Sequence, residues 1–374
     1  MTPGARTVRP GGGRTGRPAL AVVGATGAVG MVLLGLLSER ADVWGEIRLI
    51  ASSRSAGRVR SVRGEDLRIR ALSEEALAGV DVAVFAVPDE VAARWVPVAA
   101  ANGTVVVDGS RAFRMETDVP LVVPELNAHA VDLRPRGIVA SPGPTTLSMI
   151  VAMGALHREW GLEELIVSSY EAVSGAGRSG VAALRGQLAA LTSAEAAGAE
   201  LGRHPGDIRR VIASGRGNAL AADPDDPHAT PVALNVVPFT GEMGEGGWTA
   251  DELTVRSETR KVLGLPRLRV AATCVRVPVL TGHALSVHAR FGSEVSVPRA
   301  RELLANAPGV VLCDDPEQGD FPTPADVAGT DPAWAGRVRQ SLDDPNALEL
   351  FVCADNLRKG AALNMVQTAE ELAA

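Results

Sequence analysis

A short apolar run that leads through a glycine-rich turn into an apolar helix is the feature that most constrains this fold. Ala19–Val23 has the composition of a buried parallel strand, and Met31–Leu37 that of a buried helix. Between them Gly24, Gly27 and Gly30 recur at every third position. Such glycines permit a tight turn and bring a helix N-terminus against a pyrophosphate. The segment predicts a dinucleotide site in a Rossmann domain, with an ordinary βα turn as the alternative. The residues expected at the cofactor are Gly24, Thr26, Gly27, Ala28, Val29 and Gly30.

The end of the next expected strand, Glu46–Ala51, indicates which dinucleotide is bound. Rossmann domains that prefer NAD usually carry an acidic residue here, which binds the ribose diol. This chain has Ser53, Arg54 and Ser55 instead, and a guanidinium group matches the geometry of a phosphate. The pattern favours NADP, with its 2′-phosphate, over NAD, and a solvated turn is the alternative.

Further apolar runs continue the alternation of strands and helices, and the pattern changes near Pro142. We therefore expect an α/β chain with an N-terminal Rossmann domain, followed by a different unit. Residues 190–230, rich in Ala, Gly, Asp and Pro, are expected to form helix and loop. The remaining expected strands are Val80–Val87, Thr104–Asp108, Ile166–Tyr170, Val270–Leu280 and Ala284–Phe291.

Length, charge and cysteine usage narrow the class of protein. A chain of 374 residues predicts two domains, and its formal charge of −7 argues against nucleic-acid binding. No run approaches the roughly 20 apolar residues of a membrane span, and residues 1–16 read as a disordered tail without a secretory signal. We expect a cytoplasmic protein. The cysteines Cys274, Cys313 and Cys353 show neither metal spacing nor a disulfide framework, so no metal site is predicted.

Several motifs carry a resemblance to a known family. They are the glycine turn, the run 51–57, the segments 112–114 and 119–125, and Ser141-Pro142-Gly143-Pro144-Thr145-Thr146-Leu147. In this order and spacing, the chain from residue 18 onward resembles the aspartate-β-semialdehyde dehydrogenases. The resemblance implies an NADP-binding Rossmann domain of residues 17–141 and 355–374, and an α+β substrate-binding and dimerisation domain of residues 142–354. It also implies an amino-acid-like substrate and a homodimer or tetramer.

The same resemblance implies roles for individual residues. Members of the family use NADPH to reduce a cysteine-bound acyl group, formed from aspartyl phosphate, to an aldehyde. His283 matches the family's base, and Arg276 matches the arginine that grips the substrate carboxylate. Asp251 falls near the substrate amino group, and Arg114 matches an arginine that contacts the phosphate. The residues that the resemblance adds to the cofactor site are Gly175 and Asn356.

Three departures lie at the reacting end of the substrate. Pro144 stands at the position of the nucleophilic cysteine, Glu171 at that of a glutamine, and Thr254 at that of a phosphate-binding lysine. Proline has no nucleophilic side chain, although it suits the first turn of a helix. Cys274 lies on the same strand face as Arg276 and is not expected to replace the missing thiol. Further departures occur at Val87-Pro88-Asp89, Gly109 and Arg111.

Three functions remain open on the sequence. The first is an NADP-dependent oxidoreductase that acts on an aspartate-like amino acid without a thioester, with Glu171 and His283 as acid/base candidates. An alcohol–aldehyde, amine–imine or hydrazine–hydrazone couple would suit it. The second is a catalytically inactive homologue with a binding or regulatory role. The third is residual semialdehyde dehydrogenase activity by direct phosphate displacement, at a rate reduced by orders of magnitude.

Overall fold

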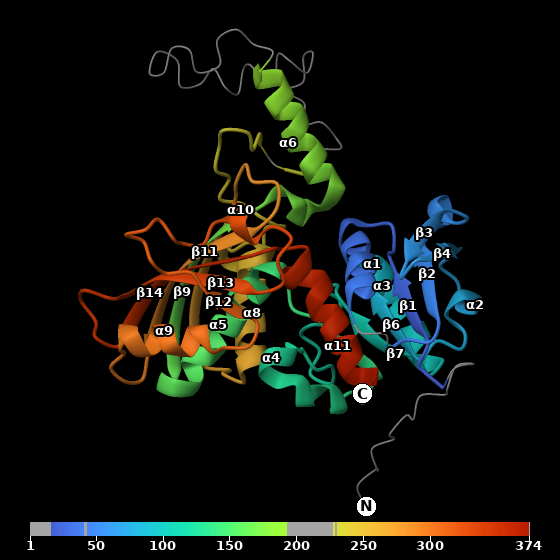
Figure 1. Cartoon of the computed structure of the whole chain (residues 1–374), viewed down its shortest axis with the longest axis horizontal. Helices are drawn as coiled ribbons and strands as arrows, with labels where there is room; N and C mark the ends of the chain where they lie inside the picture. The colour runs from blue at the N-terminus through green and yellow to red at the C-terminus, as the bar shows by residue number, and fades with distance from the viewer. Residues whose placement is uncertain (1–15, 41–42, 193–226, 229, 374) are drawn as a thin grey trace, which may run out of the picture.

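The computed structural model describes residues 16–40, 43–192, 227–228 and 230–373. Except for Gly16, the expected tail lies outside these residues, as does most of the segment 190–230. The described chain forms two six-stranded sheets with their helices (Figure 1). The first sheet has the strand order β5-β2-β1-β6-β7-β8, and all its pairs are parallel. Its strands are β1 (Leu20–Val23), β2 (Ile47–Ala51), β5 (Arg70–Ala71), β6 (Val82–Phe85), β7 (Val105–Asp108) and β8 (Ile138–Ala140).

Helices cover both faces of this sheet. Every residue of β1 is buried. Leu20 and Val22 pack in one apolar cluster with α1 and α11, whereas Ala21 and Val23 belong to another with α2 and α3. Alternate side chains of a strand point to opposite faces, so the continuous apolar run follows from a sheet buried on both sides. The elements here are α1 (Ala28–Glu39), α2 (Glu74–Leu77), α3 (Asp89–Ala101), α11 (Leu363–Ala373), η1 (Ser53–Ser55) and the hairpin β3 (Val59–Val62) and β4 (Glu65–Arg68).

The second sheet has the order β10-β9-β11-β14-β13-β12 and is mixed. The β9–β10 and β12–β13 pairs are parallel and the others antiparallel. Helices α5, α8 and α9 pack against one face of it (Figure 1). Its strands are β9 (Leu162–Glu171), β10 (Arg269–Arg276), β11 (His283–Phe291), β12 (Val310–Leu312), β13 (Ala333–Gln340) and β14 (Ala347–Ala354). The remaining elements are α4 (Pro124–Asn127), α5 (Pro144–Trp160), α6 (Gly177–Thr192), α8 (Ala250–Leu263), α9 (Val297–Ala305), α10 (Pro324–Val327), η2 (Ala128–Asp132), η3 (Val173–Ala176), η4 (Glu245–Gly247) and η5 (Arg358–Ala362).

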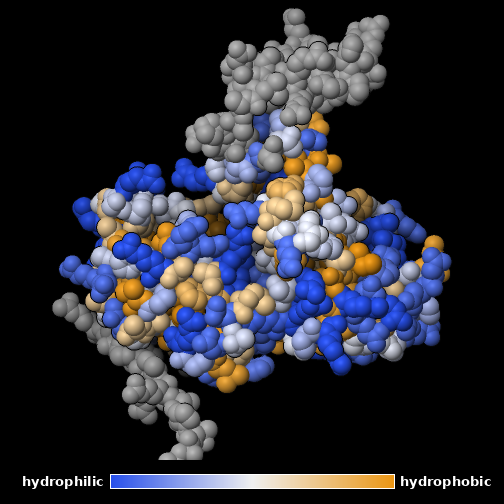
Figure 2. Space-filling view, turned by 180° about the vertical axis from the view of Figure 1, so that it is seen from behind, coloured by the Kyte–Doolittle hydropathy of each residue, from blue (hydrophilic) through white to orange (hydrophobic). Residues whose placement is uncertain are grey.

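The opposite face of the second sheet carries exposed apolar side chains. Along β9, Leu165 and Val167 are buried, while Ile166 is 46% and Tyr170 37% exposed. The molecular surface seen from behind otherwise mixes hydrophilic and hydrophobic residues (Figure 2). A sheet with helices on only one side leaves its other side available to a partner.

Strand ends differ from the sequence prediction in one place that matters for the site. The run Val270–Leu280 was expected to be one strand, but β10 ends at Arg276, since Pro278 cannot donate to a ladder. The chain then turns and re-enters the sheet at His283, the first residue of β11. Arg276 and His283 are therefore strand-end residues. The C-terminal helix α11 lies between the two sheets and contacts α1, β6 and β7 (Figure 1).

Candidate active site and nucleotide cleft

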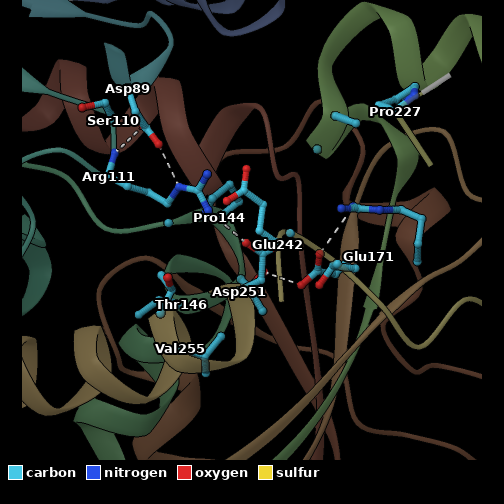
Figure 3. A pocket seen from close by; sticks show the side chains of 18 of the residues that line it. Asp89, Ser110, Arg111, Pro144, Thr146, Glu171, Pro227, Glu242, Asp251 and Val255 are labelled. Atoms are coloured by element: carbon cyan, nitrogen blue, oxygen red, sulfur yellow. Dashed lines mark hydrogen bonds and ion pairs between the residues drawn. The ribbon is translucent and has the colours of Figure 1, made fainter. Parts of the chain in front are cut away.

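A cavity of about 860 Å³ lies between the two sheets and is lined by residues from both. Asp89 and Arg111 enter it from the first domain, and Glu171 and Asp251 from the second (Figure 3). Arg276 of the second domain also lines it. The structure thus brings together the residues predicted to bind substrate, and it adds Asp89 and Arg111, which the sequence marked only as departures.

Glu171 and Arg276 line the cavity next to each other, because the strands that carry them end side by side. The parallel ladder pairs Arg276 of β10 directly with Glu171 of β9. Glu171 Oε1 accepts hydrogen bonds from Thr145 Oγ1 at 2.8 Å and Ser169 Oγ at 3.0 Å, and its Oε2 lies 3.4 Å from Arg276 Nη1. Arg276 Nη1 also donates to the Ala172 carbonyl at 2.8 Å. Both side chains are buried, and these contacts fix the position of the pair.

His283 is buried beside this pair with its tautomer fixed. Its Nδ1 accepts a hydrogen bond from the backbone N–H of Ala172 at 3.1 Å. A neutral ring that accepts at Nδ1 carries its hydrogen on Nε2. Burial, followed by the neighbouring charge of Arg276, lowers the pKa of His283 from 6.5 to about 3. In this geometry His283 is therefore neutral and offers an N–H at Nε2 as a hydrogen-bond donor.

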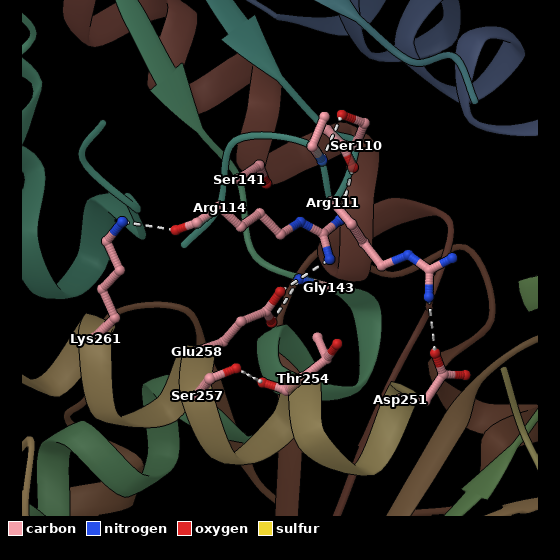
Figure 4. A network of polar contacts seen from close by, with 12 residues as sticks. Ser110, Arg111, Arg114, Ser141, Gly143, Asp251, Thr254, Ser257, Glu258 and Lys261 are labelled. Carbon is pink, nitrogen blue, oxygen red and sulfur yellow. Dashed lines mark hydrogen bonds and ion pairs between the residues drawn. The ribbon is translucent and has the colours of Figure 1, made fainter. Parts of the chain in front are cut away.

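Pro144 is the first residue of α5, and a buried ion pair supports the start of that helix (Figure 4). The N–H of Gly143 donates to Glu258 Oε2 at 2.8 Å, and Arg114 Nη1 lies 2.9 Å from Glu258 Oε1. Arg114 Nη2 donates to the Gly109 carbonyl at 2.7 Å. Two of the guanidinium nitrogens of Arg114 thus already have protein partners. The sequence did not identify Glu258, because it is 144 positions from Arg114 and no motif marks it.

Arg111 spans the mouth of the cavity between the two domains. Its Nε lies 3.0 Å from Asp89 Oδ2, its backbone N–H donates to Asp89 Oδ1 at 2.9 Å, and its Nη1 lies 3.6 Å from Asp251 Oδ1. Burial raises the pKa of Asp251, and the nearby charge of Glu171 adds to this rise. Two carboxylates that disfavour each other's charge therefore face the same cavity.

The cavity wall holds no thiol among its described residues. Cys274 and Cys353 are buried, and burial raises the pKa of both thiols, that of Cys353 to about 12. Cys274 shares the buried face of β10 with Arg276, as side-chain alternation predicts. Thr254 lines the cavity with a neutral side chain (Figure 4).

A second cavity, of about 380 Å³, lies at the glycine turn and shares Pro144 and Gly175 with the first. Gly27, the N-cap of α1, makes no side-chain cap and leaves the helix N-terminus open to a ligand. Gly24 has φ +94°, and a Cβ on it would stand 2.1 Å from the Ala86 carbonyl oxygen. A Cβ on Gly30 would lie 2.1 Å from the Gly24 carbonyl oxygen. Close packing thus requires these glycines, and the cradle fits a dinucleotide phosphate. The predicted cofactor residues that line this cavity are Gly27, Ala28, Val29, Gly175 and Asn356.

The expected ribose end of the cleft is polar. Ser53, Arg54 and Ser55 form the 3₁₀ turn η1 directly after β2, with Arg54 exposed and Ser55 buried. Thr26 of the glycine turn donates to Ser55 Oγ at 3.4 Å. The turn therefore lies next to the phosphate cradle and presents a free-standing guanidinium to solvent there.

Asn356 is hydrogen-bonded to two neighbouring segments of the site, at Ser174 and at Gly282. Its Oδ1 accepts from Ser174 Oγ at 3.1 Å and from the Gly282 N–H at 2.9 Å, and its Nδ2 donates to Ser174 Oγ at 2.9 Å. These bonds tie η3 to the loop before His283. Gly175, in η3, lines both cavities, and a Cβ on it would stand 2.8 Å from Arg276 Nη1. The loop that lies between the two cavities is thus fixed.

Comparisons with known proteins agree with this architecture. Residues 19–134 match the family model described as "Semialdehyde dehydrogenase, NAD binding domain", and residues 153–359 that described as "Semialdehyde dehydrogenase, dimerisation domain". The aspartate-semialdehyde dehydrogenase of Corynebacterium glutamicum is 42% identical over 360 residues, which cover 94% of this chain and 98% of that protein. This chain belongs to the aspartate-semialdehyde dehydrogenase family.

Other relatives support the same assignment. The Bacillus subtilis aspartate-semialdehyde dehydrogenase is 38% identical over 355 residues, with 94% of this chain and 96% of that protein covered. The crystal structure of aspartate semialdehyde dehydrogenase II from Vibrio cholerae, complexed with ASA, superposes with a TM-score of 0.84 at 35% identity, covering 95% of this chain and 98% of that one. The predicted fold, a Rossmann domain plus a dimerisation domain, is confirmed. Pro144 lies in the stretch between the two matched regions.

Two further findings concern sites of other kinds. Within the described ranges, no three or more His, Cys, Asp or Glu side chains are grouped as metal ligands. None of the helices in the described part of the chain combines the length and apolar character needed to cross a membrane.

Proposed function

We propose that this member of the family is an NADP-dependent oxidoreductase that acts on an aspartate-like amino acid without a cysteine thioester intermediate. The observation that carries the proposal is the wall shared by the nucleotide cleft and the substrate cavity. Pro144 and Gly175 line both cavities. A ligand in one cavity therefore lies against the same residues as a ligand in the other. The side chain at the expected nucleophile position is a proline ring, which forms no bond to substrate.

The nucleotide would be held by the glycine turn and the uncapped start of α1, and when bound it supplies a hydride acceptor or donor. Arg276 is suited to bind the substrate carboxylate through the guanidinium edge that Glu171 leaves free. Asp251 is suited to bind the substrate amino group. These contacts would orient the reacting carbon toward the shared wall.

His283 is suited to donate a proton to the substrate, and Glu171 is suited to accept one from it. The Nε2–H of His283 is suited to donate to an oxygen or nitrogen on the reacting carbon, because Nδ1 is already occupied by the Ala172 N–H. Glu171 is suited to accept a proton, since Thr145 and Ser169 donate to its Oε1 and leave Oε2 facing Arg276. Neither step requires a thiol.

The open face of the second sheet supports a homodimer. Ile166 and Tyr170 are exposed on it, within the region that matches the dimerisation-domain model. A second copy on this face would bury them, and a tetramer would need a further surface.

The preference for NADP should depend on Arg54. We expect NADPH to bind at least about tenfold more tightly than NADH, since a phosphate–guanidinium contact is a charge-assisted one. Arg54→Ala should remove most of that preference while leaving NADH affinity within about twofold. Calorimetry on both proteins measures this. Arg58→Ala, another exposed arginine of the same segment, is the matched control. Equal affinity of the wild type for NADH and NADPH would contradict the NADP assignment.

The redox activity itself should appear without phosphate. We expect a change in NADPH absorbance when the protein is mixed with NADP and a panel of aspartate-derived alcohols, amines and hydrazines, because Pro144 removes only the covalent route. His283→Ala should reduce kcat by at least about 100-fold, the usual contribution of acid/base catalysis. If NADPH binds but no compound in the panel is oxidised, and none of the corresponding aldehydes or imines is reduced, the protein is a binding homologue and the proposal is wrong.

A further inference from the structure

We infer that the substrate of this site is an amino acid with a second, cationic nitrogen at its reacting end, held by Glu171. This inference rests on the proposed function and names its substrate class. It begins from the charge of the cavity. Among the described residues that line the cavity, the carboxylates are Asp89, Glu90, Glu171, Glu242 and Asp251, and the cations are Arg111, Arg114 and Arg276. With neutral His283, the lining carries an excess of negative charge.

Each of these arginines also has a carboxylate partner. Arg111 Nε lies 3.0 Å from Asp89, Arg114 Nη1 lies 2.9 Å from Glu258, and Arg276 Nη1 lies 3.4 Å from Glu171. The Arg114–Glu258 pair is almost fully buried, with side-chain exposures of 8% and 1%. A buried pair of this kind does not open without leaving an uncompensated charge. The cavity therefore offers few unpaired cationic groups to a doubly charged phosphate.

Two donor groups at the positive end of α5 are also already bound to carboxylates of the protein. Helix N-termini attract anions through free N–H groups. Here Gly143, the N-cap, donates its N–H to Glu258, Pro144 has no N–H, and the hydroxyl of Thr145 donates to Glu171. The N-cap N–H and the Thr145 hydroxyl are thus bound to the protein's own carboxylates, and Pro144 supplies no donor in their place.

Glu171 is the group best placed to bind a cation. Thr145 and Ser169 fix its Oε1, while Oε2 keeps a lone pair beside the 3.4 Å contact with Arg276 (Figure 3). The cavity also holds an unused polar group: Thr146 Oγ1 is fully buried in its wall and has no hydrogen-bond partner in the described structure. A ligand N–H is a suitable partner for a hydroxyl oxygen as well as for a carboxylate.

The raised pKa of Asp251 agrees with this arrangement. Burial is its main cause, and the charge of Glu171 adds to it. An ammonium group between two such carboxylates would relieve their repulsion, whereas a phosphate would increase it. If Arg276 binds the α-carboxylate and Asp251 binds the α-ammonium, then Glu171 is the remaining carboxylate that can bind the second nitrogen.

The test compares three amino acids of matched skeleton by calorimetry on the full-length protein. They are 2,4-diaminobutyrate, which has a second amino group on its last carbon, 2-aminobutyrate, which lacks it, and aspartate, which has a carboxylate there. We expect 2,4-diaminobutyrate to bind at least about tenfold more tightly than either of the others. Inorganic phosphate should not bind detectably in this cavity. Tighter binding of aspartate or of phosphate would overturn the inference.

Glu171→Gln keeps the shape and hydrogen bonds of the side chain but removes its charge. It should lower the affinity for 2,4-diaminobutyrate by at least about tenfold and leave that for 2-aminobutyrate within about twofold. Glu90→Gln, which removes an exposed carboxylate at the cavity rim, is the control and should change neither affinity by more than about twofold. An unchanged preference in Glu171→Gln would contradict the inference. If that variant does not fold, the preference of the wild type among the three ligands decides.

The binding and redox readouts separate this inference from the proposed function. Binding of 2,4-diaminobutyrate that depends on Glu171, without any NADP-linked oxidation, would support the substrate class and contradict the oxidoreductase. NADP-linked oxidation of an aspartate-derived alcohol, with no binding of the diamine, would support the oxidoreductase and contradict the substrate class.

Discussion

Pro144→Cys alone should give at most a trace rate of phosphate-dependent oxidation of aspartate semialdehyde. The triple variant Pro144→Cys/Glu171→Gln/Thr254→Lys should give a rate at least about 100-fold higher. The measurement is NADPH absorbance with aspartate semialdehyde and inorganic phosphate. The expectation follows from the proposed correspondence of these three positions with the family's cysteine, glutamine and lysine.

The electrostatics around Pro144 explain why a thiol alone is insufficient. A thiolate at a helix N-terminus is normally stabilised by the free N–H groups of that helix. Here Thr145, the next residue, already holds the carboxylate of Glu171 at 2.8 Å. This charge would raise the pKa of a new thiol and repel phosphate. Thr254 supplies no cation, and Arg114 is committed to Glu258, so the single variant lacks both an activated nucleophile and a phosphate site.

The matched control is Pro144→Ser combined with Glu171→Gln and Thr254→Lys, because it also removes the proline but provides no thiol. It should remain at the level of the single cysteine variant. Activity in Pro144→Cys equal to that of the triple variant would mean that Glu171 and Thr254 do not obstruct the family reaction. The argument for a different substrate would then fail as well.

The Rossmann half of the chain could be predicted from sequence because its pattern is local. β1 is buried on both faces, and its apolar run ends at a glycine turn whose Gly24 is confined by the Ala86 carbonyl. The expected strands matched β2, β6 and β7 to within about two residues at either end, as boundary uncertainty allows. By contrast, β13 and β14 were not predicted. They lie in a mixed sheet where one face is open, and their polar and apolar residues alternate less regularly.

The charge pairing of the site could not be predicted from sequence because it depends on distant residues. Arg114 and Glu258 are 144 positions apart, and Asp89, the first residue of α3, is 22 positions from Arg111, which follows β7. The sequence could show that His283 and Arg276 are near each other, but not that Nδ1 of His283 is occupied by a backbone N–H. The sequence thus named candidate residues that the structure brings to one cavity, but it did not indicate their hydrogen-bond and ion-pair partners.

The stability of the protein should fall in acid partly because of His283. Its pKa is about 3 in the folded protein against 6.5 for an unperturbed histidine, so below pH 6.5 the unfolded chain binds a proton that the folded chain does not. The free energy of unfolding therefore falls as pH decreases, by about 1.4 kcal/mol per unit. Between pH 6.5 and 4.5 this gives a loss of roughly 2 kcal/mol, because the slope at pH 6.5 is only half its full value. The loss ends near pH 3, where the folded protein also takes up the proton.

His283→Asn should remove this component, because an amide oxygen can still accept the Ala172 N–H but binds no proton in this range. Urea unfolding at several pH values measures the difference in slope between the variant and the wild type. Carboxylates contribute to acid unfolding in both proteins, so only the difference is assigned to His283. The exposed His129, replaced by Asn, should leave the slope unchanged. Parallel curves for wild type and His283→Asn down to pH 4.5 would mean that His283 takes up its proton in the folded protein. The neutral donor role proposed for its Nε2 would then be wrong.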